Sequence, residues 1–306
     1  MPGARALTDD CATFAPPRGG VMVAKTDTIV GTVHTIGDEP PDLVARKALR
    51  ANLSDLAAKG AKPFAYLLSL SVPSETSDAW VKRFAEGLRR DQRAFGLGLI
   101  GGDSVTAPGP VSVTITILGH APRTTVPRRD GAKAGDDVYV TGTIGDAALG
   151  LLALRGWLRG ISARESAHLA DRYRLPRPRL EAGRELAHIV HAMMDVSDGL
   201  VGDLGHICKW SRLGAQIDWP SVPLSRAAKA ALKYRPALRS AVLSGGDDYE
   251  LLFTASPWAA SLVAAAARRA GVPVTCIGRM VKGKGVCVLD DKGRNITPSH
   301  GGFEHR

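Results

Sequence analysis

The sequence predicts an α/β or α+β chain of two domains, and three observations lead to that class. The 306 residues suffice for two compact domains of ordinary size. Segments with apolar residues at helical spacing alternate with short β-branched or apolar runs in both halves. Between the halves lies a stretch rich in proline, glycine and charge, residues 122–136 (PRTTVPRRDGAKAGD). We therefore expect one domain at residues 1–122 and a second at residues 133–306.

The first half alternates strands and helices. Strands are expected at residues 21–24, 64–72, 97–100 and 111–118, and helices at residues 42–59 and 77–95. Pro40 and Pro41 precede the first helix, and Gly60 follows it as a stop signal. Apolar residues recur along this helix at helical spacing, namely Val44, Leu49, Leu53 and Leu56. The last strand, VSVTITIL, alternates and is rich in β-branched residues.

The second half repeats this style. Strands are expected at residues 138–141 and 251–254 and near Val274, and an apolar run at residues 189–194 ends at Asp195. Helices are expected at residues 146–158, 163–172, 198–211 and 258–270. The fold class therefore rests on both halves alike.

Apolar runs in this sequence repeatedly end in aspartate beside small residues. The examples are VMVAKTD (Asp27), LGLIGGD (Asp103), HAMMDVSD (Asp195 and Asp198) and AVLSGGDD (Asp247 and Asp248). We expect these residues at strand ends, where open α/β sheets bind ligands. Gathered carboxylates stay ionised only when cations hold them together, and Mg²⁺ prefers oxygen ligands and phosphates. The pattern predicts a multi-metal site for phosphoryl transfer.

Each aspartate taken alone has a structural alternative. An aspartate after a strand is commonly a turn residue or a helix N-cap, and Asp198 before Gly199 fits turn chemistry. Asp55 is different because it lies inside the alanine-rich helix ANLSDLAAKG, on one face with Asn52. Aspartate is a poor residue for a helix interior, so we expect this face to meet a polar partner.

Several function classes are disfavoured by the sequence. It has no P-loop, protein-kinase loop set, dinucleotide fingerprint, G-x-S-x-G or H-E-x-x-H. The four cysteines form no C-x-x-C pair, which suits a reducing cytoplasm. No apolar stretch is long enough to span a bilayer. The net charge of +10 is scattered, so we expect anionic small molecules as ligands and no nucleic acid.

Eight segments in order resemble the thiamine-monophosphate kinase family, of the aminoimidazole ribonucleotide synthetase-like superfamily. They are TDDCATF (8–14), KTDTIVGTVH (25–34), RKALRANLSDLAAKGAKP (46–63), GGDS (101–104), GDDVYVTGTIGDAALGL (135–151), MDVSDGLVGDL (194–204), GGDDYELLFT (245–254) and GGFEH (301–305). Each is weak alone, but together they cover nearly the whole chain.

The resemblance implies a homodimer in which the N-terminal α/β domain forms a β-barrel with its twin, followed by a C-terminal α/β domain. It implies transfer of the γ-phosphoryl group of ATP to thiamine monophosphate, with several Mg²⁺ ions. Implied metal ligands are Asp10, Thr26, Asp27, Asp55, Asp103, Asp195 and Asp198. Implied ATP contacts are Gly102, Asp103, Arg129 and Ser197. Implied thiamine-phosphate contacts are His34, Asp247 and Phe303. No acid or base is nominated, because the acceptor phosphate is already ionised.

The chain departs from the family pattern at several positions. Lys25 replaces a small hydroxyl residue before Thr26, Thr35 stands where an aromatic is usual, and Asp247 replaces glutamate. The chain also begins almost on the TDD motif, where relatives have a further helix. Two alternatives stay open: another ATP-using enzyme of the superfamily, or a catalytically impaired nucleotide-binding homologue.

Overall fold

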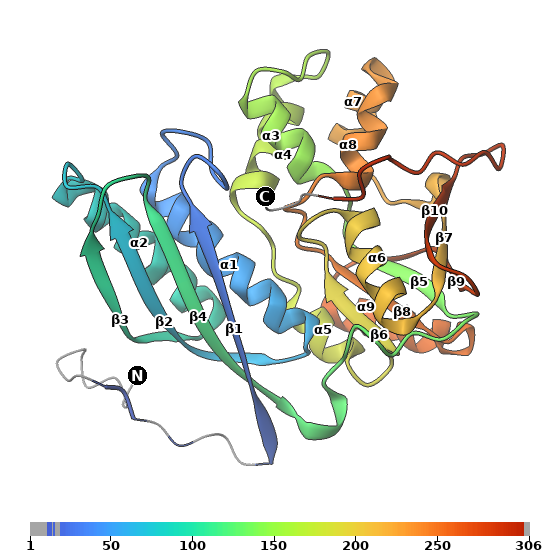
Figure 1. The fold of residues 1–306 in the computed structure, drawn as a ribbon, viewed down its shortest axis with the longest axis horizontal. Helices are drawn as coiled ribbons and strands as arrows, with labels where there is room; N and C mark the ends of the chain where they lie inside the picture. The colour runs from blue at the N-terminus through green and yellow to red at the C-terminus, as the bar shows by residue number, and fades with distance from the viewer. Residues whose placement is uncertain (1–10, 14, 16–18, 303–306) are drawn as a thin grey trace. The chain divides into compact units, whose positions relative to one another are not determined.

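The structure, a computed structural model, describes residues 11–13, 15 and 19–302 (Figure 1). It divides into two compact units. The first comprises residues 1–56 and 61–124, and the second comprises residues 57–60 and 125–306. Each unit contains one mixed sheet, mostly antiparallel, with helices packed against it. The predicted two-domain α/β class is therefore confirmed.

The sheet of the first unit has four strands. Their order is β1 (Gly20–Val30), β4 (Ser112–Pro122), β2 (Lys62–Val72) and β3 (Gly98–Thr106). The β1–β4 and β4–β2 pairs are antiparallel, and the β2–β3 pair is parallel. β1 and β3 are therefore the two edges of an open sheet. The described residues form no closed barrel, and the dimeric barrel stays a prediction.

Two helices cover one face of this sheet, α1 (Pro41–Ala58) and α2 (Asp78–Phe95) (Figure 1). Ile115 and Ile117 of β4 point toward them and are fully buried, as is Leu53 of α1. Asp91 of α2 is also buried, and its carboxylate accepts hydrogen bonds from two α1 arginines, Arg46 and Arg50. The helix layer is thus held to the sheet by apolar packing and internally by ion pairs.

The other face of the sheet carries small polar side chains. The hydroxyls of Thr26 and Thr116 lie 3.0 Å apart, and those of Thr28 and Thr114 lie 2.7 Å apart. In an antiparallel pair such opposed residues point to the same face. Leu67 and Val105 are 40% and 47% exposed. We call this surface the open face.

The second unit has a six-stranded sheet. Its order is β10 (Gly285–Leu289), β7 (Gly214–Asp218), β9 (Val274–Val281), β5 (Asp137–Thr141), β8 (Leu251–Ala255) and β6 (Ala192–Asp195). Only the β10–β7 pair is parallel. Successive residues of β5 point to opposite faces, so Val138 and Val140 enter one hydrophobic core and Tyr139 enters another.

Helices cover both faces of this sheet. The larger core, with Val138 and Val140, is closed by α3 (Asp146–Leu154), α4 (Ala163–Arg174), α6 (Leu200–Ser211), α7 (Arg226–Tyr234) and α8 (Arg239–Ser244). The smaller core, with Tyr139, is closed by α5 (Leu180–Leu186), α9 (Ala260–Ala270) and Ala57 and Ala58 from the end of α1. Of the helices in the described part of the chain, none is long and apolar enough to span a bilayer.

The expectation that the aspartates follow strand ends is wrong for four of them, Asp27, Asp103, Asp247 and Asp248. β1 and β3 continue beyond Asp27 and Asp103, because β-branched and small residues extend both strands. The run before Asp247 is not a strand but the helix α8. Of the aspartates in these runs, only Asp195 is the last residue of a strand, β6.

Candidate functional site

In the first unit, two of the predicted metal ligands meet around one lysine. The Nζ atom of Lys25 lies 3.2 Å from Oδ2 of Asp27 and 3.1 Å from Oδ2 of Asp55. Asp27 comes from β1 and Asp55 from α1. The polar partner that the sequence predicted for the Asp55 face is therefore Lys25.

The alternation of β1 explains this arrangement. Lys25 and Asp27 are two residues apart and lie opposite the buried residues Ile117 and Ile115, so both point to the face that α1 covers. Burial alone would lower the pKa of Lys25, but the carboxylates of Asp55 and Asp27 outweigh it and raise that pKa above its ordinary value. Lys25 is therefore an ammonium ion at neutral pH.

The donor set of this cluster fits a cation. Two carboxylates from separate elements converge on one point, and a positive group already lies there. Carboxylate oxygens are the ligands that Mg²⁺ prefers. The Asp27–Asp55 pair therefore suits Mg²⁺ by its chemistry, while the ammonium of Lys25 competes for the same oxygens.

Asp103 does not join this pair within one chain. The register aligns Asp27 with Gly102 across the sheet, and it puts Asp103 on the open face with Ser69 and Thr114. β1 and β3 are opposite edges, about 14 Å apart at strand spacings of about 4.8 Å. Asp27 and Asp103 of one chain therefore lie too far apart, and on opposite faces, to bind one ion.

Thr26 also belongs to the open face. Its Oγ1 donates to the main-chain oxygen of Ile115 at 3.2 Å and lies against Thr116. A metal contact from Thr26 would accordingly have to use its main-chain carbonyl. Its role as a metal ligand stays a prediction.

Gly102 has a packing reason to be glycine. Its φ is +153°, and a Cβ there would lie 1.8 Å from the main-chain oxygen of Leu68 in β2. The close approach of β3 to β2 therefore requires glycine whether or not a phosphate binds. The predicted ATP contact of Gly102 stays a prediction.

His34 lies in the turn after β1. Its Nδ1 accepts a hydrogen bond from the main-chain N–H of Val30 at 2.9 Å, and its carbonyl accepts from the buried Lys47 ammonium at 2.9 Å. Because Nδ1 is an acceptor, the ring proton must be on Nε2. His34 can therefore offer an N–H donor from a fixed ring.

In the second unit, the residues after β6 form a tight loop that Asp203 holds. The main-chain N–H groups of Ser197, Asp198 and Gly199 donate to Oδ2 of Asp203 at 3.0, 3.0 and 3.1 Å. Asp203 is buried, and burial together with the nearby Asp198 and Asp195 raises its pKa to about 8. Its Oδ1 has no hydrogen-bond partner among the described residues.

Three side chains near this loop could hold a metal ion together. They are Asp198, Asp203 and His206, and one possible ligand atom from each lies within 4.8 Å of the other two. Asp195, buried at the end of β6, precedes the same loop. The buried, unpartnered oxygen of Asp203 and the acidic donor set both fit Mg²⁺.

The loop that carries Asp247 packs against the loop after β6. The N–H of Asp247 donates to the main-chain oxygen of Ser197 at 2.8 Å. A Cβ at Gly246 would lie 2.1 Å from that same oxygen, so only glycine fits there. Asp247 itself adopts φ +70°, a conformation that is costly for residues other than glycine. The structure therefore joins Ser197, Asp198 and Asp247 in one constellation.

The C-terminal tail approaches the same loop. A Cβ at Gly302 would lie 2.9 Å from the main-chain oxygen of Asp198. Phe303, the predicted substrate contact, lies outside the described residues, as does Asp10.

Arg129, a predicted ATP contact, is exposed in the segment before β5, and its carbonyl accepts a hydrogen bond from the Ser211 hydroxyl at 3.3 Å.

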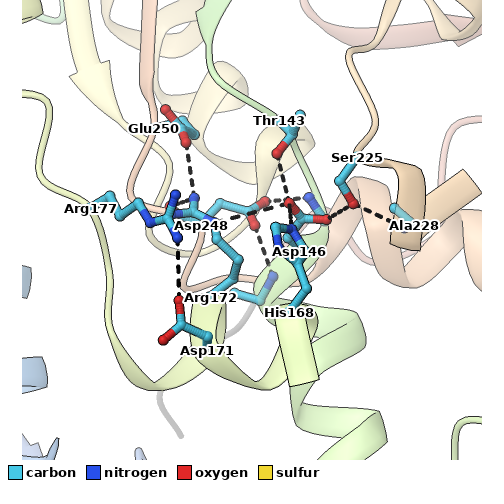
Figure 2. Close-up of polar contacts among 12 residues, drawn as sticks. Thr143, Asp146, His168, Asp171, Arg172, Arg177, Ser225, Ala228, Asp248 and Glu250 are labelled. Carbon is cyan, nitrogen blue, oxygen red and sulfur yellow. Dashed lines mark hydrogen bonds and ion pairs between the residues drawn. The ribbon is translucent and has the colours of Figure 1, made fainter. Parts of the chain in front are cut away.

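Asp248 and Glu250, which follow Asp247 in the chain, belong to a buried charged network that the sequence did not predict (Figure 2). Glu250 accepts hydrogen bonds from Arg172 at 2.9 Å, from Nε of Arg179 at 2.6 Å and from the Thr141 hydroxyl at 2.7 Å. Asp248 accepts from the main-chain N–H groups of Gly145 and Ala147, which start α3. The network holds Asp248 and Glu250, the two residues on either side of Tyr249, whose φ is +51°. The acidic GGDDYE run and the arginine-rich run around residues 172–184 were visible in the sequence, but their pairing was not.

The chain is similar to known proteins over nearly its whole length. Residues 8–121 match the family model of the AIR synthase related protein N-terminal domain, and residues 133–291 match that of its C-terminal domain. Thiamine-monophosphate kinase of Caulobacter vibrioides is 43% identical over 307 residues, covering 99% of this chain and 86% of the relative. The chain belongs to the thiamine-monophosphate kinase family.

Solved structures of this family have the same fold. Thiamine-monophosphate kinase from Stenotrophomonas maltophilia superposes with a TM-score of 0.85 at 38% identity, covering 92% of this chain and 89% of the other. A structure of AaThiL complexed with AMPPCP and TMP gives a TM-score of 0.79 at 28% identity, with 97% and 91% covered. The family is therefore supported by sequence and fold together.

Proposed function

We propose that this chain is a kinase that transfers the γ-phosphoryl group of ATP to the phosphate of thiamine monophosphate, giving thiamine diphosphate and ADP. The observation that carries the proposal is the full-length match to thiamine-monophosphate kinases. The AaThiL structure holds the nucleotide analogue AMPPCP together with TMP, which supports the same pair of reactants here.

The carboxylates give this function a physical basis. Asp195 and Asp198 in the second unit would hold Mg²⁺, and Asp27 and Asp55 in the first unit would hold it beside the Lys25 ammonium. Bound Mg²⁺ neutralises phosphate charge. The residues themselves orient the reactants, and no general base is needed because a phosphate oxygen is ionised at neutral pH.

His34 and Asp247 suit the acceptor substrate. The fixed Nε2–H of His34 can donate to a phosphate oxygen, since its Nδ1 already accepts from Val30. The carboxylate of Asp247 can accept from a donor group of the thiamine moiety. Phe303 completes the substrate contacts that the family resemblance implies.

We further propose a homodimer in the cytoplasm, where the free cysteines of this chain would stay reduced. The open face leaves Leu67 and Val105 exposed beside a row of threonines, and a second copy would cover it. A dimer in which β3 of the second copy lies beside edge strand β1 of the first would also remove the separation across the sheet, because it would bring Asp103 of the second copy to the edge that carries Asp27.

The reaction is tested by incubating purified protein with Mg·ATP and either thiamine or thiamine monophosphate, with separation of products by chromatography. Thiamine diphosphate formed from the monophosphate but not from thiamine is expected. ATP binding without product from either acceptor would instead favour a nucleotide-binding homologue.

The shared site is tested by mixing two inactive variants, Asp27→Asn and Asp103→Asn. If each site needs Asp27 from one chain and Asp103 from the other, mixed dimers contain one intact site, and activity returns to about a quarter of wild type at equal mixing. No recovery after demonstrated subunit exchange would refute the shared site without touching the reaction itself.

A further inference from the structure

Lys25 places its ammonium between two carboxylates that could otherwise share a metal ion. We propose that the Lys25 ammonium is a built-in cation that takes the place of one divalent ion between Asp27 and Asp55. The chain would then assemble this carboxylate pair without metal and bind one divalent ion fewer than a variant without the lysine.

The geometry assigns both carboxylates to one ammonium. Nζ of Lys25 lies 3.2 Å from Asp27 Oδ2 and 3.1 Å from Asp55 Oδ2. An ammonium has three donors, so it can bind both oxygens at once. The side chains of Lys25 and Asp55 are 33% and 19% exposed, so water screens these contacts only in part.

A divalent ion and the ammonium compete for the same place. A divalent ion held by Asp27 and Asp55 would use carboxylate oxygens that Lys25 already contacts, so the ion and the ammonium would repel each other. Lys25 is two residues from Asp27 on the same strand, and its position is fixed by the β1–β4 register.

A small hydroxyl residue at position 25 would leave a different site. A serine side chain carries no charge, and its hydroxyl is an oxygen ligand for a cation. The two aspartates would then repel each other unless a metal ion joined them. Lys25→Ser therefore removes the built-in cation and should restore the need for a metal ion between Asp27 and Asp55.

The proposal rests on the proposed function only in taking Asp27 and Asp55 as part of the nucleotide site. Its test therefore measures binding and stability, which need no turnover. Mn²⁺ serves as the probe, because free Mn²⁺ is counted directly by electron paramagnetic resonance. The number of Mn²⁺ ions bound per chain is compared for the wild type, Lys25→Ser and Lys25→Arg. Thermal unfolding of each is recorded with EDTA and with Mn²⁺.

Lys25→Ser is expected to bind about one Mn²⁺ more per chain than the wild type. Its unfolding temperature should fall in EDTA and recover with Mn²⁺, whereas the wild type responds less. Lys25→Arg keeps the charge and should match the wild-type count. The matched control is Lys62→Ser, which removes an exposed lysine from β2 of the same sheet and should leave both readouts unchanged.

Equal Mn²⁺ counts for the wild type and Lys25→Ser, with equal responses to EDTA, would overturn the proposal. If Lys25→Ser does not fold in either buffer, Lys25→Gln takes its place with the same expectation, because glutamine also removes the charge. Failure of the kinase reaction would appear in the chromatographic assay alone and would leave these counts unaffected.

Discussion

Arg172 and Glu250 form an ion pair in the interior of the second unit. Nη2 of Arg172 lies 2.9 Å from Oε1 of Glu250, and the two side chains are 3% and 0% exposed. The same Nη2 donates to the main-chain oxygen of Asp248 at 3.2 Å. One guanidinium therefore holds the segment that follows Asp247 by its main chain and by a side chain (Figure 2).

Removing the charge of Glu250 should destabilise the protein strongly. Glu250→Gln removes the anion that Arg172 and Arg179 share and leaves Arg172 only the Asp146 carboxylate at 4.0 Å; breaking a buried pair costs about 3–5 kcal/mol. The measurement is the free energy of unfolding in urea. The matched control is Glu185→Gln, whose partner Arg269 is 53% exposed, and its cost should stay below about 1 kcal/mol. Equal losses for the two variants would contradict the structural role of Glu250.

Asp247→Gly should separate substrate binding from folding. Glycine accepts φ +70° without strain but gains freedom in the unfolded chain, so stability should stay within about 1 kcal/mol of wild type. The KM for thiamine monophosphate should rise about 10- to 100-fold, as expected for losing a hydrogen bond to a charged group worth about 1.5–3 kcal/mol. As a control, Arg212→Gly at the similar φ of 58° should leave the kinetics unchanged. An unchanged KM for Asp247→Gly would remove Asp247 from the substrate site.

The two glycines before Asp103 should differ in their tolerance of alanine. A Cβ at Gly102 would lie 1.8 Å from the main-chain oxygen of Leu68, whereas one at Gly101 meets only the end of the Leu67 side chain at 3.2 Å. Gly102→Ala should therefore cost about 1–3 kcal/mol or more, and Gly101→Ala about 0.5 kcal/mol or less. Urea unfolding of both variants checks this. Similar stabilities would mean that β3 does not approach β2 as closely as described.

Asp248 should make stability depend on pH. Burial raises its pKa from 3.8 to about 8, against hydrogen bonds from Gly145 and Ala147 that lower it. The folded state then keeps a proton that the unfolded state has lost, so this stabilisation is complete below about pH 4 and disappears as pH rises through about 8. The wild type should therefore exceed Asp248→Asn in unfolding free energy by more at pH 5 than at pH 8.5. A gap that is constant or wider at pH 8.5 would contradict the raised pKa.

Local patterns predicted most of the helices and strands, and long-range pairing explains what they missed. The α2 helix, capped by Ser77, and the alternating strand β4 lie close to their expected positions because their signals are local. β1 runs to Val30 because pairing with β4 extends it through KTDTIV, which has no apolar periodicity of its own. The short elements α5, β7 and β10 gave no expectation, since their stability comes from packing and not from local sequence.

The candidate site was predictable in its residue types but not in its pairings. An aspartate in the interior of the helix ANLSDLAAKG is unfavourable by itself, and this correctly indicated a polar partner for Asp55. That the partner is Lys25 depends on the β1 register and the path of α1, which no spacing in the sequence encodes. The separation of Asp27 from Asp103 likewise follows from strand order, β1 and β3 being opposite edges.

The central claim is direct transfer of a phosphoryl group from ATP to thiamine monophosphate at a site that needs the Asp27 carboxylate. Its most direct test follows the label from ATP labelled in the γ-phosphate into thiamine diphosphate, with the wild type and folded Asp27→Asn side by side. Labelled thiamine diphosphate is expected from the wild type, at a rate at least about 100-fold above that of the variant. Absence of labelled product from the wild type, or equal rates for the two proteins, would contradict the claim.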